Sequence, residues 1–450
     1  MKTTETAERL QFVCIDLKSF YASVECVDRG LDPMTCDLVV ADGSRTEKTI
    51  CLAVSPSLKA KGVRNRCRVF EIPKKLDYMM APPRMARYIE KSVEIYGIYL
   101  SWVSKDDIHV YSIDEAFIDL GPYLTMYHMS AEELARAIRA DVVKRSGIPA
   151  TCGLGSNLYL AKVALDISAK HSEDFFGILT EQLYRETLWN HRPITDFWRV
   201  GPGIARRLDA LGIHTMGELA VADQDPIYDA MGIDAEILID HAWGQEPCQM
   251  SHIKAYEPAT HCIATAQVLA HDLSKAEALT VAKEMADAVS LELVVKKKQA
   301  GSVVVWVGYA LTQEERAALR AAGDVHYWGG ASGGGSLRFL SPTSSRAQIM
   351  DAVEHVFCQR VDPERQVHRL SVTLDAVVDE DLSGVQLDLF QDTAELDRER
   401  RQLEAMSAVK GKFGKNALLY AYDLLPEATA RERNEQIGGH RAGSGSEVPT

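Results

Sequence analysis

The chain has 450 residues, of which 46% are hydrophobic and 25% are charged, and this length suggests about three domains. The composition excludes a wholly disordered or collagen-like chain, and no apolar run reaches the ~20 residues that a membrane-spanning helix needs. Nine scattered cysteines without a C-x-x-C spacing predict reduced core residues, and not a zinc site or a disulfide framework. The N-terminal residues lack the apolar core of a signal peptide, so we expect a cytoplasmic protein.

The formal net charge of −14 taken alone argues mildly against binding to nucleic acid. Two local basic runs point the other way: residues 59–68 contain five lysines and arginines and no acid, and residues 296–298 are three consecutive lysines. Either run alone would most often be a solvated surface. Local patches, and not the net charge, decide whether a phosphate backbone is attracted, so both runs are candidate DNA contacts.

The first 170 residues alternate between strand and helix patterns. A short buried strand is predicted over 11–16, then a helical pattern, strands near 37–41 and 50–55, and a helix over 83–100. Two apolar β-runs over 110–120 flank Asp114 and Glu115, which predicts a hairpin turn. Ser130 and Glu133 form a capping box for a helix to about 146, and a strand over 150–155 and a helix over 156–168 follow. This order predicts an α+β domain with helices on one sheet.

The remaining chain divides into a helical region, a second α+β unit and a tail. Residues 170–248 have a helical pattern, and 249–259 are expected to form a linker. Strands over 260–268, 302–309, 336–341 and 367–376 alternate with helices after Ser274 and over 345–359, the βαββαβ order of the ferredoxin-like pattern. Glycine-rich residues 329–335 are expected to be a flexible loop. After 377 we predict an acidic linker, a helix-like stretch over 394–410 and a polar tail, disordered over 438–450.

Three carboxylates stand at predicted strand ends. Asp16 ends the first strand, and Asp114 and Glu115 lie in the turn between two others. If those strands are neighbours in one sheet, the three side chains converge and repel one another unless a divalent cation such as Mg²⁺ neutralises them. Such a site suits two-metal phosphoryl transfer, in which one ion activates a hydroxyl and the other holds a triphosphate. For any one of these acids alone, a strand end facing water would be the simpler interpretation.

The segments that carry these acids, together with the helix after 155, resemble the motifs of the Y-family DNA polymerases, the translesion enzymes. They are IDLKSFYASVE (15–25), YSIDEAFIDL (111–120) and GLGSNLYLAKVALDISAK (153–170), and they are most similar to the bacterial UmuC-like branch. The resemblance implies a right-hand polymerase of the α+β class. Its parts would be a ferredoxin-like palm over 1–170 with small fingers at about 20–80, a helical thumb with a helix-hairpin-helix over 171–248, the linker over 249–259, a βαββαβ little-finger domain over 260–376, and a flexible C-terminal region over 377–450.

The resemblance also implies roles for single residues. Asp16, Asp114 and Glu115 match the catalytic metal ligands, and Leu17 matches the residue that adds a backbone carbonyl. The implied cofactor is a pair of Mg²⁺ ions, with Mn²⁺ as a substitute. Tyr21 matches the steric gate, the ring that would collide with a ribose 2′-hydroxyl.

Four further residues match positions that meet the incoming nucleotide. Phe20 precedes the gate, and Lys162 matches a lysine that reaches the triphosphate. Lys59 matches a basic residue of the fingers. Ser55 or Pro56 stands where the DinB branch has a tyrosine, and we choose Ser55 as the nucleotide contact.

Two segments are predicted to hold DNA. VGPGIARRL (200–208) predicts a helix-hairpin-helix in which Gly201 and Gly203 let the backbone approach a phosphate, with added charge from Arg206 and Arg207. A plain helix connection with a glycine cap is the alternative for this segment. In the little finger, the expected backbone contacts are Lys296, Lys297, Lys298 and Arg338.

Residues 386–390, QLDLF, resemble the peptide by which bacterial polymerases bind the sliding clamp. The predicted contacts are Gln386, Leu387, Leu389 and Phe390. Exposed apolar residues in an acidic segment with no core to join usually mark a partner site. A tail that folds back on the body of the protein is the alternative.

These observations predict a template-directed DNA polymerase that performs error-prone translesion synthesis. Its partners would be primer–template DNA, dNTP, the sliding clamp and the small accessory proteins with which UmuC-like polymerases work. We expect it in the cytoplasm with the bacterial nucleoid and without a membrane. Two rival hypotheses are a nucleotide cyclase, which needs no duplex-binding module, and a catalytically silent scaffold, which needs no self-repelling acid triad.

Overall fold

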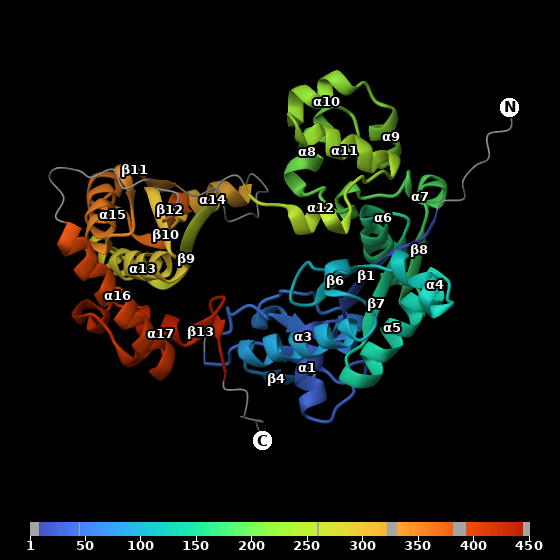
Figure 1. Ribbon diagram of the computed structural model, residues 1–450, viewed down its shortest axis with the longest axis horizontal. Helices are drawn as coiled ribbons and strands as arrows, with labels where there is room; N and C mark the ends of the chain where they lie inside the picture. Colours follow the sequence, from blue (N-terminus) through green and yellow to red (C-terminus); the bar gives the residue numbers. More distant parts are fainter. Residues whose placement is uncertain (1–8, 45, 259–260, 322–330, 381–392, 444–450) are drawn as a thin grey trace. The chain divides into compact units, whose positions relative to one another are not determined.

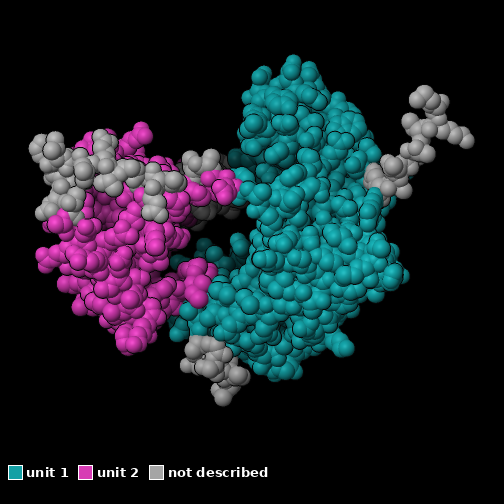
Figure 2. Space-filling view, in the orientation of Figure 1, with its two compact units in different colours: residues 1–256, 441–450 teal, residues 257–440 magenta. Residues whose placement is uncertain are grey.

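The computed structural model describes residues 9–44, 46–258, 261–321, 331–380 and 393–443. The chain divides into two compact units, residues 1–256 with 441–450 and residues 257–440 (Figures 1 and 2). The division falls inside the range for which a linker was predicted. Helix α12 (Met250–Ala255) occupies much of that range, so the connection is more regular than the sequence suggested.

A five-stranded sheet in the order β5-β6-β1-β7-β8 is the centre of the first unit. Its strands are β1 (Phe12–Leu17), β5 (Ile108–Val110), β6 (Glu115–Asp119), β7 (Ala150–Gly155) and β8 (Phe176–Leu179). β1 is antiparallel to both β6 and β7, and β8 is parallel to β7. Strands β1, β5, β6 and β7 therefore have the ferredoxin-like arrangement that was predicted for the palm, and β8 extends it.

Helices cover both faces of this sheet (Figure 1). Helix α6 (Leu158–Val163) packs against Phe12, Cys14 and Phe117 on one face. The other helices of this part are α1 (Phe20–Asp28), α3 (Met85–Leu100), α4 (Leu124–Tyr127) and α5 (Ala131–Ser146). Ser130 caps α5 in the predicted capping box with Glu133. The chain leaves α6 through a π-helical turn over Ala164–Ser168.

A small three-stranded sheet in the order β3-β2-β4 has its own apolar core. Its elements are β2 (Leu38–Val40), β3 (Ala53–Val54), helix α2 (Pro56–Ala60) and β4 (Met79–Ala81). The core gathers Val39, Val54, Leu58 and Cys67. This subdomain lies within the range predicted for the fingers.

The last part of the first unit is helical. It comprises α7 (Glu181–Leu188), α8 (Pro202–Ala210), α9 (Met216–Val221), α10 (Gln224–Met231) and α11 (Asp234–Trp243). Its core includes Phe197, Leu208, Leu219 and Leu238 and continues into Tyr159 and Leu160 of α6. The helical part is thus packed directly onto the helix that lies over the sheet.

The second unit is a four-stranded antiparallel sheet with helices α13 and α15 packed on it through one core. In chain order it contains β9 (His261–Leu273), α13 (Lys275–Lys296), β10 (Lys298–Tyr309), α14 (Gln313–Ala321), β11 (Ser332–Thr343), α15 (Arg346–Arg360) and β12 (Val367–Asp379). The sheet order is β11-β10-β12-β9, so the second and fourth strands are central. In the palm the first and third strands are central. The two domains therefore share the order of helices and strands along the chain but differ in the order of strands across the sheet.

Two predictions for the second unit need correction. Of the predicted loop 329–335, residues 329–330 lie outside the described residues, and Gly333, Gly334 and Gly335 belong to strand β11, where they pair with β10. A side chain at Gly334 would come within 2.1 Å of the carbonyl oxygen of Val305. A side chain at Gly333 would meet the hydroxyl of Tyr309 at 2.2 Å. The close pairing of β11 with β10 thus requires a glycine at 334, and the Tyr309 hydroxyl leaves no room for a side chain at 333.

The second correction concerns the region from 377 onward, which was expected to be flexible. Helix α16 (Thr393–Phe413) corresponds to the predicted helix-like stretch, but the chain then continues through α17 (Ala430–Asn434) as ordered structure packed on α13. The backbone amides of Thr429 and Ala430 donate to the buried carboxylate of Glu284 over 2.9–3.1 Å. Asp287 binds Tyr422 and Arg346. The composition predicted a polar tail after this helix, but buried acids on α13 bind Tyr422, Thr429 and Ala430 in this region.

Candidate active site

Backbone pairing brings the three predicted acids to one end of the palm sheet. Asp16 is the register partner of Glu115 across the β1–β6 pair. The amide of Leu17 donates to the carbonyl of Asp114 over 2.9 Å. The hydroxyl of Ser112 donates to Asp114 Oδ1 over 2.7 Å and orients that carboxylate. Acids that are distant in sequence therefore share one sheet end, as the strand pattern predicted.

The electrostatics of Asp16 show how crowded this end of the sheet is. The pKa of Asp16 is raised from 3.8 to about 7, mainly by burial and also by the charges of Asp114 and Glu115, while Lys170 and Lys162 oppose the shift. A carboxylate that is desolvated beside two others is disfavoured in its charged form. A cation placed among the three would remove that penalty.

The donor chemistry fits a hard divalent cation. All three side chains offer carboxylate oxygens, which Mg²⁺ prefers, and the backbone of Leu17 lies at the same strand end. Across the described ranges, no group of three or more acidic, histidine or cysteine side chains is already arranged to hold a metal ion. Mg²⁺ commonly uses only one or two carboxylates and completes its shell with water and substrate phosphates.

Lys162 lies against the acids and is held by them. Its Nζ is 2.7 Å from Glu115 Oε1 and 3.1 Å from Asp166 Oδ2, and the side chain is 9% exposed. The position depends on the bare backbone of β7: a side chain at Gly155 would come within 2.3 Å of the amide nitrogen of Ala161. The close approach of α6 to β7 thus places Lys162 against Glu115 and not in open solvent.

Three other lysines surround Asp16. Burial lowers the pKa of Lys59 and of Lys18, the charge of Asp16 opposes both shifts, and the neighbouring charge of Lys170 adds to them. Lys170 Nζ is 2.8 Å from Asp166 Oδ1, and its side chain remains 46% exposed. A group of cations beside acids is the arrangement expected where a metal-bound polyphosphate is held.

Sequence reasoning missed Lys18 and Lys170. A signal for Lys170 was present, since Lys162, Asp166 and Lys170 recur at four-residue intervals and so share one helix face. Asp166 pairs with both lysines. Lys18 directly follows the acid motif, but its proximity to Lys59 and Lys170 depends on tertiary structure.

Tyr21 is fixed from behind by a buried network. Its ring stacks on Tyr88 of α3, with centroids 4.5 Å apart and planes at 15°. The Tyr88 hydroxyl donates to Glu25 Oε1 over 2.8 Å, and Arg84 Nε donates to the same oxygen over 2.9 Å. Burial raises the pKa of Tyr21, and the charge of Asp114 raises it further while Arg66 lowers it. The half-buried ring therefore lies close to the acids in a defined orientation.

Phe20 and Ser55, which were predicted to contact the nucleotide, are both buried in the structure. Phe20 is 2% exposed and belongs to the core, because the first residue of α1 points inward where Tyr21 points outward. Ser55 is fully buried: its hydroxyl caps α2 by accepting from the amide of Leu58, and it also accepts from the amide of Leu38 over 3.1 Å. Neither side chain is available to a nucleotide.

Comparison with known proteins agrees with this geometry. Residues 15–166 match the impB/mucB/samB family, and residues 261–389 match the impB/mucB/samB family C-terminal domain. UvrX of Bacillus subtilis (strain 168), whose name describes a UV-damage repair protein, is 30% identical over 442 residues, which cover 96% of this chain and 98% of the relative. The chain belongs to the impB/mucB/samB family, the UmuC/DinB-like Y-family polymerases.

Further similarities support the same assignment for this polymerase. DNA polymerase IV 2 of the same organism is 28% identical over 431 residues, covering 95% of this chain and 97% of the relative. A solved Y-family DNA polymerase chimera, Dbh-Dpo4(243-245)-Dbh, matches the fold with a TM-score of 0.61 at 19% identity, over 82% of this chain and 99% of that one. The protein is thus a translesion-type, DNA-directed DNA polymerase with the α+β fold of the Y family that the sequence motifs predicted.

The predicted phosphate-binding segment of the polymerase is exposed. Gly201 is the N-cap of α8, and a side chain added at Gly201 or Gly203 would meet no atom within 4 Å. The glycines therefore leave open space and are not demanded by packing. Arg206 and Arg207 are both exposed, and Arg207 Nη1 donates to the carbonyl of Ala230 over 3.2 Å.

The predicted little-finger contacts are partly neutralised in the polymerase. Lys296 Nζ lies 2.6 Å from Glu292, and Lys298 Nζ lies 2.7 Å from Asp379. Lys297 ends α13 in a left-handed conformation with a φ of 53°. Arg338 lies on β11. The clamp-binding residues 386–390 lie outside the described residues.

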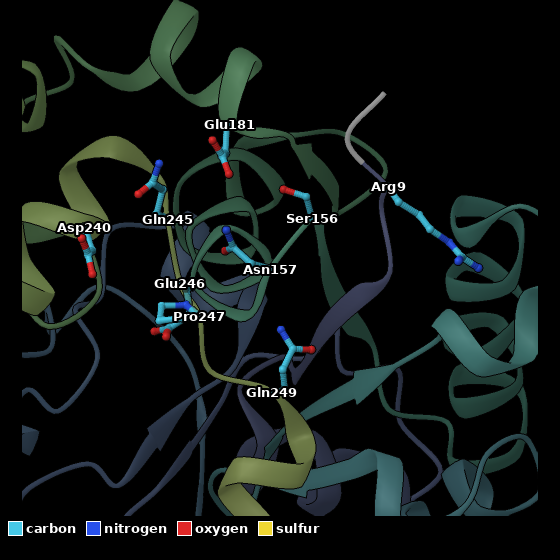
Figure 3. A pocket seen from close by; sticks show the side chains of 9 residues that line it. All are labelled: Arg9, Ser156, Asn157, Glu181, Asp240, Gln245, Glu246, Pro247 and Gln249. Atoms are coloured by element: carbon cyan, nitrogen blue, oxygen red, sulfur yellow. The ribbon is translucent and has the colours of Figure 1, made fainter. Parts of the chain in front are cut away.

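A polar cleft of about 430 Å³ lies at the N-terminal end of α6, away from the predicted catalytic residues. Figure 3 shows Ser156 and Asn157 on one side of it and Asp240 and Gln245 on the other. None of the acids or lysines described above lines this cleft. Within the described part of the chain, no helix is long and apolar enough to cross a membrane.

Proposed function

We propose that this polymerase performs error-prone translesion synthesis by two-metal nucleotidyl transfer and belongs to the UmuC-like branch. The observation that carries the proposal is the placement of Asp16, Asp114 and Glu115 at one end of the palm sheet, beside a group of lysines. The reaction is attack of a primer 3′-hydroxyl on the α-phosphate of a dNTP, with pyrophosphate as the leaving group.

Asp16 and Asp114, with the backbone of Leu17 and the carboxylate of Glu115, would hold two Mg²⁺ ions. Bound there, the ions would activate the primer hydroxyl and neutralise charge on the triphosphate. The raised pKa of Asp16 supports this role, because a site that disfavours its own negative charge gains the most from a cation.

The lysines have two different tasks in this proposal. Lys170, Lys59 and Lys18 bind the triphosphate, since Lys170 is half-exposed and all three interact with Asp16 or its surroundings. Lys162 was predicted to do this from the resemblance, but its Nζ is engaged by Glu115 and Asp166 in a nearly buried position. Lys162 is therefore assigned to orienting Glu115.

Tyr21 selects the sugar. Its half-buried ring is backed by Tyr88 and lies within the field of Asp114, which is where the sugar of a nucleotide bound at the acids would pass. A ribose 2′-hydroxyl would then collide with a ring that cannot retreat. Discrimination arises from this clash and not from a hydrogen bond.

The remaining contacts are with DNA and with partners. The start of α8, with Gly201 at its N-cap and Gly203 in its first turn, would receive backbone phosphates, which carry no base information, so binding would be independent of sequence. Exposed Arg206 would add charge. The QLDLF segment at 386–390 would bind the sliding clamp, and small accessory proteins would act with this branch.

The decisive experiment is primer extension on undamaged and lesion-bearing templates, with and without Mg²⁺, for the wild type and Asp114→Ala. Loss of a metal ligand should lower the rate at least ~10³-fold, while DNA binding is retained because the thumb and little finger hold the duplex. Near-normal extension by Asp114→Ala would overturn the assignment. Extension that stops at every lesion would leave a polymerase without the translesion role.

A further inference from the structure

An aromatic contact joins the loop before α8 to the turn that carries two of the acids. The indole Nε1 of Trp198 donates to the hydroxyl of Tyr111 over 3.1 Å, and the rings meet edge to face with centroids 5.9 Å apart. Trp198 also packs on Phe117 of β6, with centroids 6.0 Å apart. The indole thus touches both the start of the catalytic turn and the strand that follows it.

On the palm side, Tyr111 closes the turn on which Asp114 and Glu115 sit. The amides of Tyr111 and Ser112 both donate to the carbonyl of Glu115, over 3.0 Å and 3.1 Å. Lys162 Nζ lies 5.9 Å from the centre of the Tyr111 ring and 2.7 Å from Glu115. A displacement of Tyr111 would therefore be transmitted to the Glu115 carboxylate by two routes, the turn backbone and Lys162.

On the thumb side, Trp198 is anchored in a rigid setting. Its ring lies parallel to that of His241 at 6.2 Å, and His241 is 1% exposed and stacked on Tyr159 at 3.9 Å. The next residue, Arg199, has a φ of +70°, a left-handed conformation that residues other than glycine rarely adopt. Such a conformation persists only where the surroundings impose it.

Trp198, which contacts Tyr111, lies close in the chain to a residue predicted to bind a DNA phosphate. Gly201, the N-cap of α8 and the predicted phosphate-binding position, lies only three residues further on. Only Arg199, in its left-handed conformation, and the buried Val200 separate the two residues, so a DNA contact that fixes Gly201 would also restrict Trp198. The hydrogen bond from Trp198 to Tyr111 would then connect this loop to the turn that carries Asp114 and Glu115.

We propose that Trp198 and Tyr111 are positioning residues that couple DNA binding at the α8 loop to the placement of Asp114 and Glu115. The inference rests on the proposed function of those acids. Catalytic groups must be held to within a fraction of an ångström, and misplacement by about 1 Å can cost ~10²-fold in rate. The coupled quantity is therefore the rate of nucleotide addition on bound DNA, and not the affinity for DNA.

The test is a double-mutant cycle with Tyr111→Phe, Trp198→Phe and the double variant. Tyr111→Phe keeps the ring and removes only the acceptor hydroxyl, and Trp198→Phe removes the donor. Tyr127→Phe is the matched control, because it loses a 2.7 Å hydrogen bond to the carbonyl of Trp102 elsewhere in the palm. The measurements are kcat and dNTP KM in single-nucleotide addition, DNA Kd by fluorescence anisotropy, and the thermal midpoint.

Each single variant should lower kcat about fivefold, as expected for one lost hydrogen bond, with DNA Kd and dNTP KM within about twofold of wild type. The double variant should be no slower than the slower single variant, because both remove the same contact. Tyr127→Phe should retain the wild-type kcat.

Three results would overturn the proposal. Multiplicative losses in the double variant would show that the two residues act independently. A rise in DNA Kd with kcat unchanged would show that this exposed pair contacts DNA directly. Single variants indistinguishable from Tyr127→Phe would show no positioning role, and Tyr111→Phe decides this even if Trp198→Phe is unstable. Failure of the proposed function is separate, since Asp114→Ala would then retain activity.

Discussion

Replacement of Asp16 by asparagine should make the metal-free polymerase more stable while it abolishes nucleotide addition. The folded protein holds a proton on Asp16 up to a pKa of about 7, whereas the unfolded chain loses it at about 3.8. Ionisation therefore costs the folded state stability. The cost is absent below pH 3.8, increases between 3.8 and 7, and is complete above about 7.

The size of the effect follows from that interval. At 1.36 kcal/mol per pH unit, the ionised carboxylate costs the folded state about 4 kcal/mol at pH 8 and roughly 1.5 kcal/mol at pH 5. Asparagine keeps the shape of the side chain and carries no charge. With ~2 °C per kcal/mol for a unit of this size, Asp16→Asn should melt about 8 °C above wild type at pH 8 and about 3 °C above it at pH 5.

The assay is thermal unfolding in the presence of a chelator at both pH values, repeated with Mg²⁺. Added Mg²⁺ should raise the midpoint of wild type and leave that of Asp16→Asn nearly unchanged, because the variant has lost a ligand. Asp106→Asn, at an exposed acid outside the site, is the matched control and should change neither midpoint appreciably. A variant no more stable than wild type at pH 8, or equally stabilised at both pH values, would refute the reasoning.

Four further outcomes are expected. Tyr21→Ala should raise incorporation of ribonucleotides more than it changes that of deoxynucleotides, and an unchanged ratio of the two efficiencies would place the gate elsewhere. Lys170→Ala should raise the KM for dNTP by about tenfold, the cost of one charge-assisted contact, with a smaller change in DNA Kd; equal effects on both would contradict a triphosphate role. Primer–template affinity should fall with salt, with a slope of log K against log salt of about −4 to −5 for about five phosphate contacts, and a flat dependence would mean that the basic runs face solvent. Changing Leu389 and Phe390 to alanine should leave distributive extension intact and remove stimulation by a loaded clamp on singly primed circular DNA, whereas equal stimulation of both proteins would assign the contact to another surface.

Much of the candidate site was accessible from local sequence. Asp16, Asp114, Glu115 and Tyr21 could be proposed from the sequence, because each belongs to a short motif whose strand or turn is determined by nearby residues. The capping boxes at Ser130 and Ser274 were equally local and are present as predicted. Alternating strand and helix patterns predicted an α+β first domain and a second βαββαβ unit, and the family resemblance added the ferredoxin-like arrangement of the palm.

Other features depended on partners that no local pattern identifies. Ser55 was assigned to the nucleotide because it stands near the position where the DinB branch has a tyrosine, yet its hydroxyl accepts from the amide of Leu38 across the small sheet. Lys162 has the same residue type that a triphosphate contact needs, but the packing of α6 on bare glycines of β7 places it on Glu115. A motif gives the identity of a side chain, whereas the groups that compete for it come from elsewhere in the chain.

By itself, the amino-acid sequence predicted most helices and strands in their order, because helix periodicity, strand alternation and capping act over a few residues. It missed strand β8 (Phe176–Leu179) inside a range expected to be helical. It also supplied the hypothesis of three metal-binding acids and a steric gate. The tertiary structure decided the pairing of Asp16 with Glu115, the stacking of Tyr21 on Tyr88 and the docking of the C-terminal residues on α13. It also decided that Gly334 lies in a strand. These outcomes depend on sheet register, on desolvation and on the satisfaction of buried polar groups, which are properties of the assembled core and of no single segment.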